Sequence, residues 1–264
     1  MSRVKMRLAT CLIPLALLAC GEAEEPLSQT DVAPAASEPS ACKPVVFEET
    51  PLTHCIAAPA KHAIAMDLGP DDGAPYRSLA GLAANRAPDA PAVAFAMNGG
   101  MYDEAGEPIG YYVEGGERLH ELNRADGPGN FHLKPNGVFF GTGDTWRVLT
   151  SAKFYDTVSD RPEFGTQSGP MLVIDGELHP DFSEDGESKK TRNGVGVDAA
   201  GRAHFVISEA PVSFGKFARY FRDVAETPNA LFLDGSVSQL WNAARGRMDN
   251  GPSLGPIIVV EIKE

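Results

Sequence analysis

The chain has 264 residues, and its 36 aspartates and glutamates outnumber its 23 lysines and arginines, giving a formal net charge of −13 at pH 7. So acidic a chain is not expected to bind nucleic acid, because the two would repel each other. An anionic ligand would have to be met by individual arginines rather than by the overall charge. The length beyond Cys42 suits one domain of ordinary size with a buried core.

Residues 1–20 have the pattern of a bacterial export signal, in which basic residues precede an apolar core too short to span a membrane. Cys20 directly follows Leu-Leu-Ala, which resembles the lipobox of bacterial lipoproteins. We therefore expect a lipid anchor on Cys20 that holds the exported chain in the envelope, at the periplasmic face of the outer membrane. An ordinary secretory signal cut near Cys20 is the alternative. Residues 21–41, rich in Ala, Pro, Glu and Ser, predict a flexible tether, which leaves 42–264 as the folded domain.

Cys42 and Cys55 are the cysteines that remain beyond the signal and Cys20. In an oxidising periplasm such a pair predicts a disulfide. The bond would close a loop of about a dozen residues and stabilise the fold by about 3 kcal/mol on the chain-entropy estimate. A catalytic thiol is the alternative, but no histidine has a spacing that would support it.

The sequence predicts no cofactor and no metal ligands. None of the six histidines forms an H-x-x-H or H-x-x-x-H pair, which disfavours zinc. The acidic stretch 103–107 lacks the alternating ligands of a calcium loop. A divalent metal remains an open alternative.

The pattern of apolar runs and turns predicts an α+β fold, with a mixed, largely antiparallel sheet core, a few packing helices and one or two β-α-β crossovers. A helix capped by Ser78 should connect strands at 63–68 and 92–97. A second helix, beginning after Ser213, carries apolar residues at i, i+3, i+4, i+7 and i+11 and should pack on the sheet. Further strands and hairpins are expected at 109–117, 138–140, 171–174, 193–197, 203–207, 230–233 and 255–262.

Polar residues stand beside glycines where several of these strands end, and glycines let a ligand approach backbone N–H groups closely. Any one of these groups could also be an ordinary turn or strand end. If the strands around the second helix lie parallel, Glu209 and Asp234 would face one cleft, as the paired carboxylates of glycosidases do. A plain turn at Asp234-Gly235 is the alternative. The candidate substrate-binding residues are Asn98, Gly99, Gly100, Asn136, Gln167, Ser168, Gly169, Asn193, Gly194, Ser208, Gly235 and Ser236.

Five short motifs occur in a fixed order along the chain: Asn98-Gly99-Gly100-Met101-Tyr102, Lys134-Pro135-Asn136-Gly137-Val138-Phe139, Thr166-Gln167-Ser168-Gly169-Pro170-Met171-Leu172, Arg192-Asn193-Gly194-Val195-Gly196 and Leu233-Asp234-Gly235-Ser236. The ordered set resembles the phosphodiester glycosidase family, the bacterial relatives of the enzyme that uncovers mannose 6-phosphate by removing N-acetylglucosamine from a phosphodiester. The resemblance extends from about Val45 to the C-terminus. Val237 departs from it, because the uncovering enzyme continues its Asp-Gly motif with further glycines. A different sugar or aglycone is therefore expected here.

The resemblance implies hydrolysis of the bond between a sugar's anomeric carbon and a phosphodiester oxygen, in an envelope or extracellular glycan. Arg192, with the backbone around Ser168-Gly169 and Gly194, would then neutralise charge on the leaving phosphate. Asp234 and Glu209 would activate water and stabilise the oxocarbenium-like centre, while Asn98, Asn136 and Gln167 would hold sugar hydroxyls. The partner would be a carbohydrate or sugar phosphate. The alternatives are a non-catalytic lipoprotein that binds cell-envelope glycan, and a hydrolase of another glycan bond.

Overall fold

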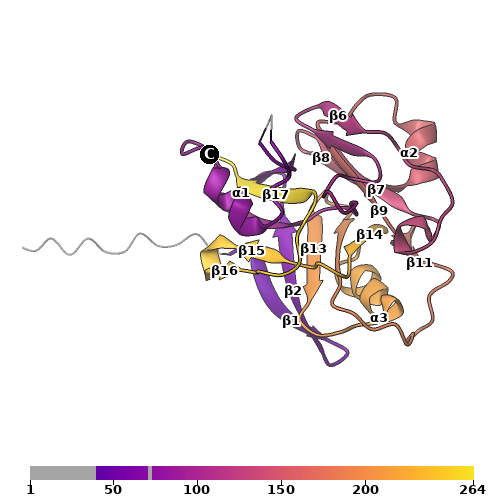
Figure 1. Ribbon diagram of the computed structural model, residues 1–264. Helices are drawn as coiled ribbons and strands as arrows, with labels where there is room; N and C mark the ends of the chain where they lie inside the picture. The colour runs from indigo at the N-terminus through magenta and orange to yellow at the C-terminus, as the bar shows by residue number, and fades with distance from the viewer. Residues whose placement is uncertain (1–39, 71–72) are drawn as a thin grey trace, which may run out of the picture. The chain divides into compact units, whose positions relative to one another are not determined.

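The structure is a computed structural model that describes residues 40–70 and 73–264 (Figure 1). The predicted export signal, Cys20 and nearly all of the predicted tether lie outside these ranges. Within them, no helix is both long and apolar enough to cross a membrane.

The described strands form three sheets in which every neighbouring pair is antiparallel. One sheet has seven strands in the order β1 (Cys42–Phe47), β2 (Thr50–Ala57), β13 (Ala203–Ser208), β12 (Asn193–Val197), β14 (Asn229–Asp234), β10 (Met171–Ile174) and β11 (Glu177–Leu178). A second sheet has the order β16 (Arg247–Met248), β15 (Leu240–Asn242), β4 (Val93–Asn98), β17 (Ile257–Ile262) and β3 (His62–Asp67). The third has the order β6 (Glu117–His120), β5 (Tyr112–Glu114), β9 (Phe164–Ser168), β7 (Gly137–Thr142) and β8 (Thr145–Thr150). The helices are α1 (Leu79–Asn85), α2 (Ser151–Thr157) and α3 (Phe214–Arg219), and the predicted α+β class is confirmed.

The two predicted strand-helix-strand units are present, and each has an antiparallel strand inserted between its two strands. Helix α1 connects β3 and β4, which lie on either side of β17. Helix α3 connects β13 and β14, which lie on either side of β12. The C-terminal ends of β13 and β14 therefore lie at the same sheet edge, one strand apart.

Serine caps begin both predicted helices. Ser78 Oγ accepts the amide proton of Gly81, and Ser213 Oγ accepts that of Lys216 at 3.2 Å. Helix α3 continues as a π-helical turn to Val224, and its predicted apolar face is buried against the seven-stranded sheet. The caps and the apolar spacing are thus enough to predict both helices.

Three phenylalanine rings join the three sheets in one core. Phe205 of β13 contacts Phe95 of β4 at 5.3 Å and Phe139 of β7 at 5.7 Å between ring centres, both edge to face. All three rings are completely buried. Such aromatic contacts add to the stabilisation from burial itself, so the strand ends of the three sheets are held in fixed relative positions.

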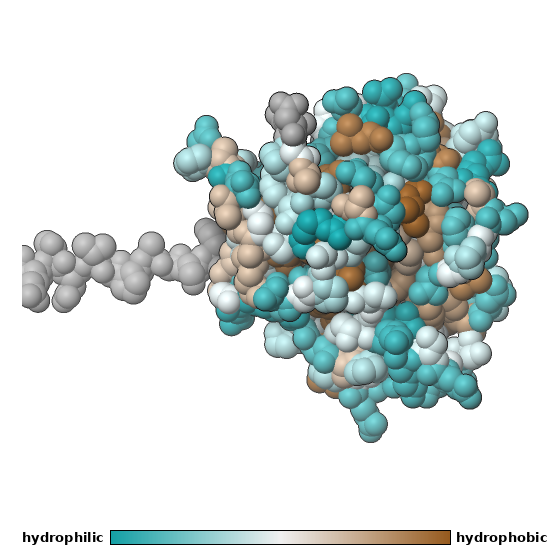
Figure 2. Space-filling view, viewed as in Figure 1, coloured by the Kyte–Doolittle hydropathy of each residue, from teal (hydrophilic) through white to brown (hydrophobic). Residues whose placement is uncertain are grey.

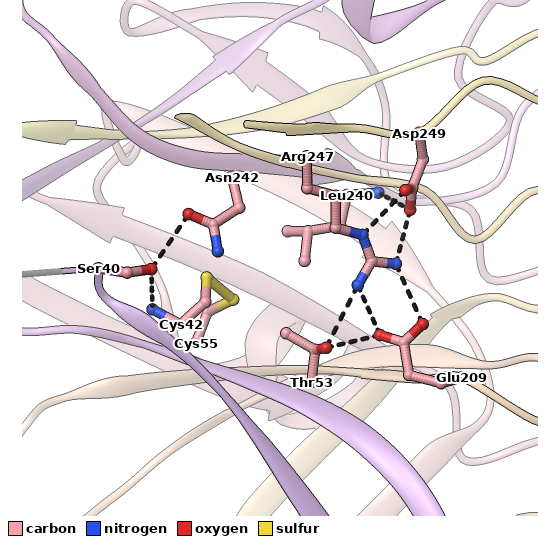
Figure 3. The surroundings of a disulfide bond; sticks show 9 residues. All are labelled: Ser40, Cys42, Thr53, Cys55, Glu209, Leu240, Asn242, Arg247 and Asp249. Atoms are coloured by element: carbon pink, nitrogen blue, oxygen red, sulfur yellow. Dashed lines mark hydrogen bonds and ion pairs between the residues drawn. A yellow bond between two sulfur atoms is a disulfide. The ribbon is translucent and has the colours of Figure 1, made fainter. Parts of the chain in front are cut away.

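The predicted disulfide is confirmed: Cys42 of β1 and Cys55 of β2 stand directly opposite each other and are bonded (Figure 3). Replacing both cysteines by serine should lower the free energy of unfolding by about 3 kcal/mol, because the unfolded chain regains the entropy of the open loop. Urea unfolding of the oxidised wild type and the double variant measures the difference. A loss below about 1 kcal/mol would contradict a stabilising role.

A buried chain of hydrogen bonds crosses β2 and β13. Asp198 Oδ2 lies 3.0 Å from His204 Nε2, His204 Nδ1 lies 2.9 Å from His54 Nε2, and His54 Nδ1 lies 2.8 Å from the hydroxyl of Tyr220. Burial lowers the pKa of both His54 and His204, which favours neutral imidazoles at neutral pH. Because the carboxylate of Asp198 can only accept, neutral His204 and then neutral His54 each donate from Nε2, and Tyr220 donates to His54. Burial, followed by the charge of His204, lowers the pKa of His54 to about 3.

This chain predicts that the protein loses stability in acid. Below about pH 6.5, His54 binds a proton in the unfolded chain but stays neutral in the folded one. The free energy of unfolding should therefore decrease as the pH is lowered, until the folded pKa near 3 is reached. The expected slope is about 1.4 kcal/mol per pH unit for each such histidine. Urea unfolding across this range should show a shallower slope for His54→Gln than for wild type, while His120→Gln, which lies outside this hydrogen-bonded chain at the end of β6, keeps the wild-type slope. Equal slopes in all three proteins would contradict the prediction.

Candidate active site

Strand ends from all three sheets meet at one place. Asn98 ends β4, Ser168 ends β9, and Asn193 begins β12 beside Asp234 at the end of β14. Asn193 Nδ2 donates to Asn98 Oδ1 at 2.9 Å, and Ser168 Oγ donates to the carbonyl of Leu233 at 2.6 Å. These two bonds connect the seven-stranded sheet to each of the five-stranded sheets next to Asp234.

The buried amides of Asn98 and Asn193 hold the turn that follows β14. Asn98 Oδ1 accepts the amide proton of Gln239 at 2.9 Å, and Asn193 Oδ1 accepts that of Asp234 at 3.0 Å. Ser238 Oγ donates to the carbonyl of Asp234 at 2.8 Å. The contacts of the two asparagines therefore fix the backbone that carries Asp234.

Asp234 is the half-buried carboxylate of this turn. Its Oδ1 accepts the amide proton of Ser236 at 2.7 Å. Burial raises the pKa of Asp234 above its ordinary range, and the backbone amides of Ser236, Gly235 and Val237 oppose the rise. Burial, together with the charge of Asp234, also raises the pKa of Tyr102 to about 12. Asp234 is thus more basic than an exposed aspartate.

Arg192, at the start of β12, is 1% exposed and forms no ion pair with any described carboxylate. Its Nε donates to the carbonyl of Val212 at 2.9 Å, and its Nη2 donates to that of Ser188 at 2.8 Å. The guanidinium carbon lies 3.5 Å from the centre of the Phe214 ring. Burial lowers the pKa of Arg192 to about 10, so the side chain still carries its charge at neutral pH.

The third guanidinium nitrogen of Arg192, Nη1, has no hydrogen-bond partner among the described residues. It borders the turn after β14, because a Cβ added to Gly235 would lie 3.6 Å from it. A buried positive charge without a counter-ion is costly, and an anion that pairs with it recovers that cost. The arrangement is therefore suited to binding an anionic group next to Asp234.

Gly169 and Asn136 form a neighbouring wall. A Cβ on Gly169 would lie 2.7 Å from Asn136 Cβ and 2.8 Å from the carbonyl oxygen of Phe131. A larger residue at this position would therefore displace Asn136 or the Phe131 backbone. Asn136 Nδ2 donates to the same carbonyl at 2.8 Å. Its Oδ1 has no partner among the described residues, and Asn136 lines a cavity of about 350 Å³. This amide oxygen is therefore a candidate acceptor for a ligand in the cavity.

Gln167 uses its whole side-chain amide inside the protein. Oε1 accepts the amide protons of Tyr111 and Asn123, each at 2.9 Å. Nε2 donates to the carbonyl of Asn123 at 2.7 Å and to Ser151 Oγ at 3.1 Å. The visible role of Gln167 is to hold the loop around Asn123 in place.

The other candidate residues on the strands also make internal contacts. The amides of Gly99 and Gly100 donate to the carbonyl of Pro256 at 2.7 Å and to Thr166 Oγ1 at 3.0 Å. Ser208 Oγ accepts the amide proton of Arg192 at 2.9 Å. Gly194 packs tightly in the sheet, because a Cβ there would lie 2.8 Å from the carbonyl oxygen of Leu231.

Glu209 lies in a separate network beyond the end of β13 (Figure 3). Its two carboxylate oxygens accept from Arg247 at 2.5 and 3.3 Å, and Oε1 also accepts from Thr53 Oγ1 at 2.5 Å. Arg247 in turn donates to Asp249 at 2.8 Å. The structure thus brings Asp234 and Arg192 to one turn, while Glu209 is engaged by Arg247.

The described residues contain no group of three or more His, Cys, Asp or Glu side chains placed to hold a metal ion.

Two residues of this site are not among the sequence-derived candidates. Ser238 holds the carbonyl of Asp234, and the charge of Asp234 contributes, after burial, to the raised pKa of Tyr102. Tyr102 closes the motif that begins at Asn98, and Ser238 follows the Asp234 motif by two residues. Proximity to these motifs is the only signal in the sequence that could have indicated them.

Comparison with known proteins gives a family match. A sequence model described as phosphodiester glycosidase matches residues 92–256, more than half of the chain, and this stretch contains every candidate residue from Asn98 to Ser236. The uncharacterised protein YigE of Escherichia coli (strain K12) is 39% identical over 149 residues, which cover 56% of this chain and 58% of YigE. The chain thus spans somewhat more than half the length of this curated relative.

Solved structures share the fold. The catalytic domain of zebrafish N-acetylglucosamine-1-phosphodiester alpha-N-acetylglucosaminidase matches with a TM-score of 0.57 at 13% identity, over 84% of this chain and 82% of that chain. A protein from Burkholderia pseudomallei K96243, described as exported, matches with a TM-score of 0.52 at 11% identity, over 80% of this chain and 74% of that chain. Identities this low establish the fold alone.

Proposed function

The chain belongs to the phosphodiester glycosidase family, and from this membership we propose that it hydrolyses the bond between a sugar's anomeric carbon and a phosphodiester oxygen. The observation that carries the proposal is that an unpaired, buried guanidinium borders the turn that holds a carboxylate of raised pKa. Arg192 supplies the first and Asp234 the second.

The leaving group accounts for this division of roles. When the glycosidic bond breaks, its electron pair stays on the phosphate oxygen, and a phosphate monoester with a second pKa near 6 departs. Such a group needs little protonation by a general acid, but it needs its developing charge neutralised. In the proposal, Arg192 Nη1 and the amides around Ser168-Gly169 supply that neutralisation.

Asp234 acts on the water. Its carboxylate takes a proton as the water oxygen bonds to the anomeric carbon, and its charge also stabilises the oxocarbenium-like centre. Asn98, Asn193 and Ser238 position the turn, and Asn136 Oδ1 accepts from a sugar hydroxyl. Glu209 would have to leave Arg247 before it could take part, so we assign the base role to Asp234.

The proposed setting is the bacterial envelope. The Leu-Leu-Ala-Cys20 sequence supports a lipid anchor, and a fold relative is described as exported. The substrate would then be an envelope or extracellular glycan that contains sugar-1-phosphodiesters.

Phosphorus and proton NMR on the full-length chain with a panel of sugar-1-phosphodiesters tests the proposal. Release of a phosphate monoester together with free sugar supports it, and the same assay with a chelator decides whether a metal is required. Line broadening with every compound intact would contradict it in favour of a glycan-binding lipoprotein. Turnover only of glycans that lack phosphate would contradict it in favour of another hydrolase.

A further inference from the structure

A basic cavity of about 390 Å³ lies beside helix α2 in the third sheet. Tyr111 and Phe154 are buried at its base, and the ring of Tyr155 is 61% exposed. The cavity is also lined by three arginines, Arg118, Arg124 and Arg161, and by two carboxylates, Glu121 and Asp160. Its lining is thus net positive on a chain whose formal net charge is −13.

Two of these arginines lack a carboxylate partner among the described residues. Arg118 pairs with Glu121 at 2.8 Å. The Arg124 guanidinium instead lies 4.1 Å from the centre of the Tyr155 ring. Arg161 makes one long hydrogen bond, from Nη1 to the carbonyl of Gly116 at 3.5 Å. Both guanidinium groups can therefore accept an anion without first breaking an ion pair.

A second cavity connects this region to the candidate active site. The cavity of about 350 Å³ that Asn136 lines is also lined by Arg124 and by Lys134, whose ammonium is ion-paired with Asp126. Arg124 belongs to both cavities. Asn136 in turn packs against Gly169, whose neighbour Ser168 is bonded to the strand of Asp234. Arg124 thus links the cavity at Asn136 to the cavity that Arg161 lines. Figure 2 shows one face of the molecule, on which hydrophobic side chains occur as separate patches among hydrophilic ones.

We propose that the two cavities form a subsite for the part of the substrate beyond the scissile phosphodiester, and that this part is a polyanionic chain with further phosphodiester groups. Arg124 and Arg161 bind successive phosphates, and the exposed Tyr155 ring packs against a sugar between them. The inference rests on the proposed function, which identifies the bond that is hydrolysed. The subsite further implies that the preferred substrate is a polymer, such as a sugar-phosphate chain, rather than a small diester.

Calorimetric titration of the full-length chain with linear tripolyphosphate at low ionic strength tests the subsite independently of turnover. The double variant Arg124→Gln/Arg161→Gln should bind about tenfold more weakly than wild type, equivalent to about 1.4 kcal/mol. Arg147→Gln/Arg245→Gln is the matched control, because it removes the same charge from exposed positions outside both cavities. The control should bind as wild type does.

Equal weakening in both double variants would overturn the proposal, because overall charge would then explain binding, and so would an absence of binding to wild type. A turnover assay distinguishes failure of the proposed subsite from failure of the proposed function. For a substrate with several phosphodiesters, KM should rise about tenfold in Arg124→Gln/Arg161→Gln with kcat unchanged, while a methyl-phosphodiester substrate is unaffected. If wild type turns over neither substrate, the proposed function fails, and the tripolyphosphate titration still decides whether the subsite exists.

Discussion

Asp234→Asn should lower kcat/KM for a sugar-1-phosphodiester by about 10²–10⁴-fold, the loss typical of a missing general base. Asparagine has the same shape, and its Oδ1 can still accept the amide proton of Ser236, so the turn after β14 should stay folded. What disappears is the ability to take a proton from water and the negative charge beside the anomeric carbon. Initial rates and a thermal unfolding curve, measured on the same preparations, check both statements.

Glu209→Gln is the matched control for this prediction. It also neutralises a carboxylate, but one that is engaged by Arg247 and Thr53. We expect it to change stability more than turnover. If Glu209→Gln lost as much activity as Asp234→Asn, the assignment of the base to Asp234 alone would be wrong.

The pH profile gives a second readout of Asp234. Burial raises the pKa of Asp234, so its carboxylate becomes protonated at a higher pH than an ordinary aspartate does. As the pH is lowered, the wild-type kcat/KM should therefore begin to decrease at a pH above the pKa range of ordinary aspartates. The residual activity of Asp234→Asn should lack this acid limb.

Arg192→Met should lower kcat/KM for phosphodiester substrates by about 10²–10³-fold, the typical cost of removing a preorganised donor from a developing charge. Methionine keeps much of the apolar stem, but it loses the guanidinium that lies over the Phe214 ring and the hydrogen bonds to Val212 and Ser188. Some loss of stability is therefore expected as well. Urea unfolding quantifies that part separately.

A change of leaving group distinguishes catalysis from structure at Arg192. For an aryl glycoside of the same sugar, which has no phosphate, Arg192→Met should reduce activity far less than for the phosphodiester. A merely structural role would reduce both activities by the same factor, and that result would refute the assigned role of Arg192.

The parts of the fold that could be predicted are those with strong local signals. Ser78 and Ser213 marked helix starts, and Asp175-Gly176 marked the turn between β10 and β11, where both residues have positive φ. The β1–β2 hairpin has no such signal, because its turn residues, Glu48 and Glu49, adopt positive φ without a glycine or asparagine. Helix α2 was missed because it follows β8 directly, with Thr150 both ending the strand and capping the helix.

For the site, the sequence identified strand ends but not the contacts between them. Asp234 and Arg192 could be proposed because each stands in a motif with glycine. The engagement of Glu209 by Arg247 could not, since it joins the end of β13 in one sheet to β16 in another, 38 positions apart in the chain. The internal use of the Gln167 amide depends on the distant loop around Asn123, which has no marked pattern of its own.

The measurement that tests the central claim most directly is hydrolysis of a sugar-1-phosphodiester by the full-length chain in ¹⁸O-labelled water, followed by phosphorus NMR. Because water is proposed to attack the anomeric carbon, the released phosphate monoester should contain no ¹⁸O, the label should enter the sugar, and Asp234→Asn should slow the reaction by about 10²–10⁴-fold. An isotope shift showing ¹⁸O on phosphorus would mean that the P–O bond is cleaved, which would contradict glycosidase chemistry at this site.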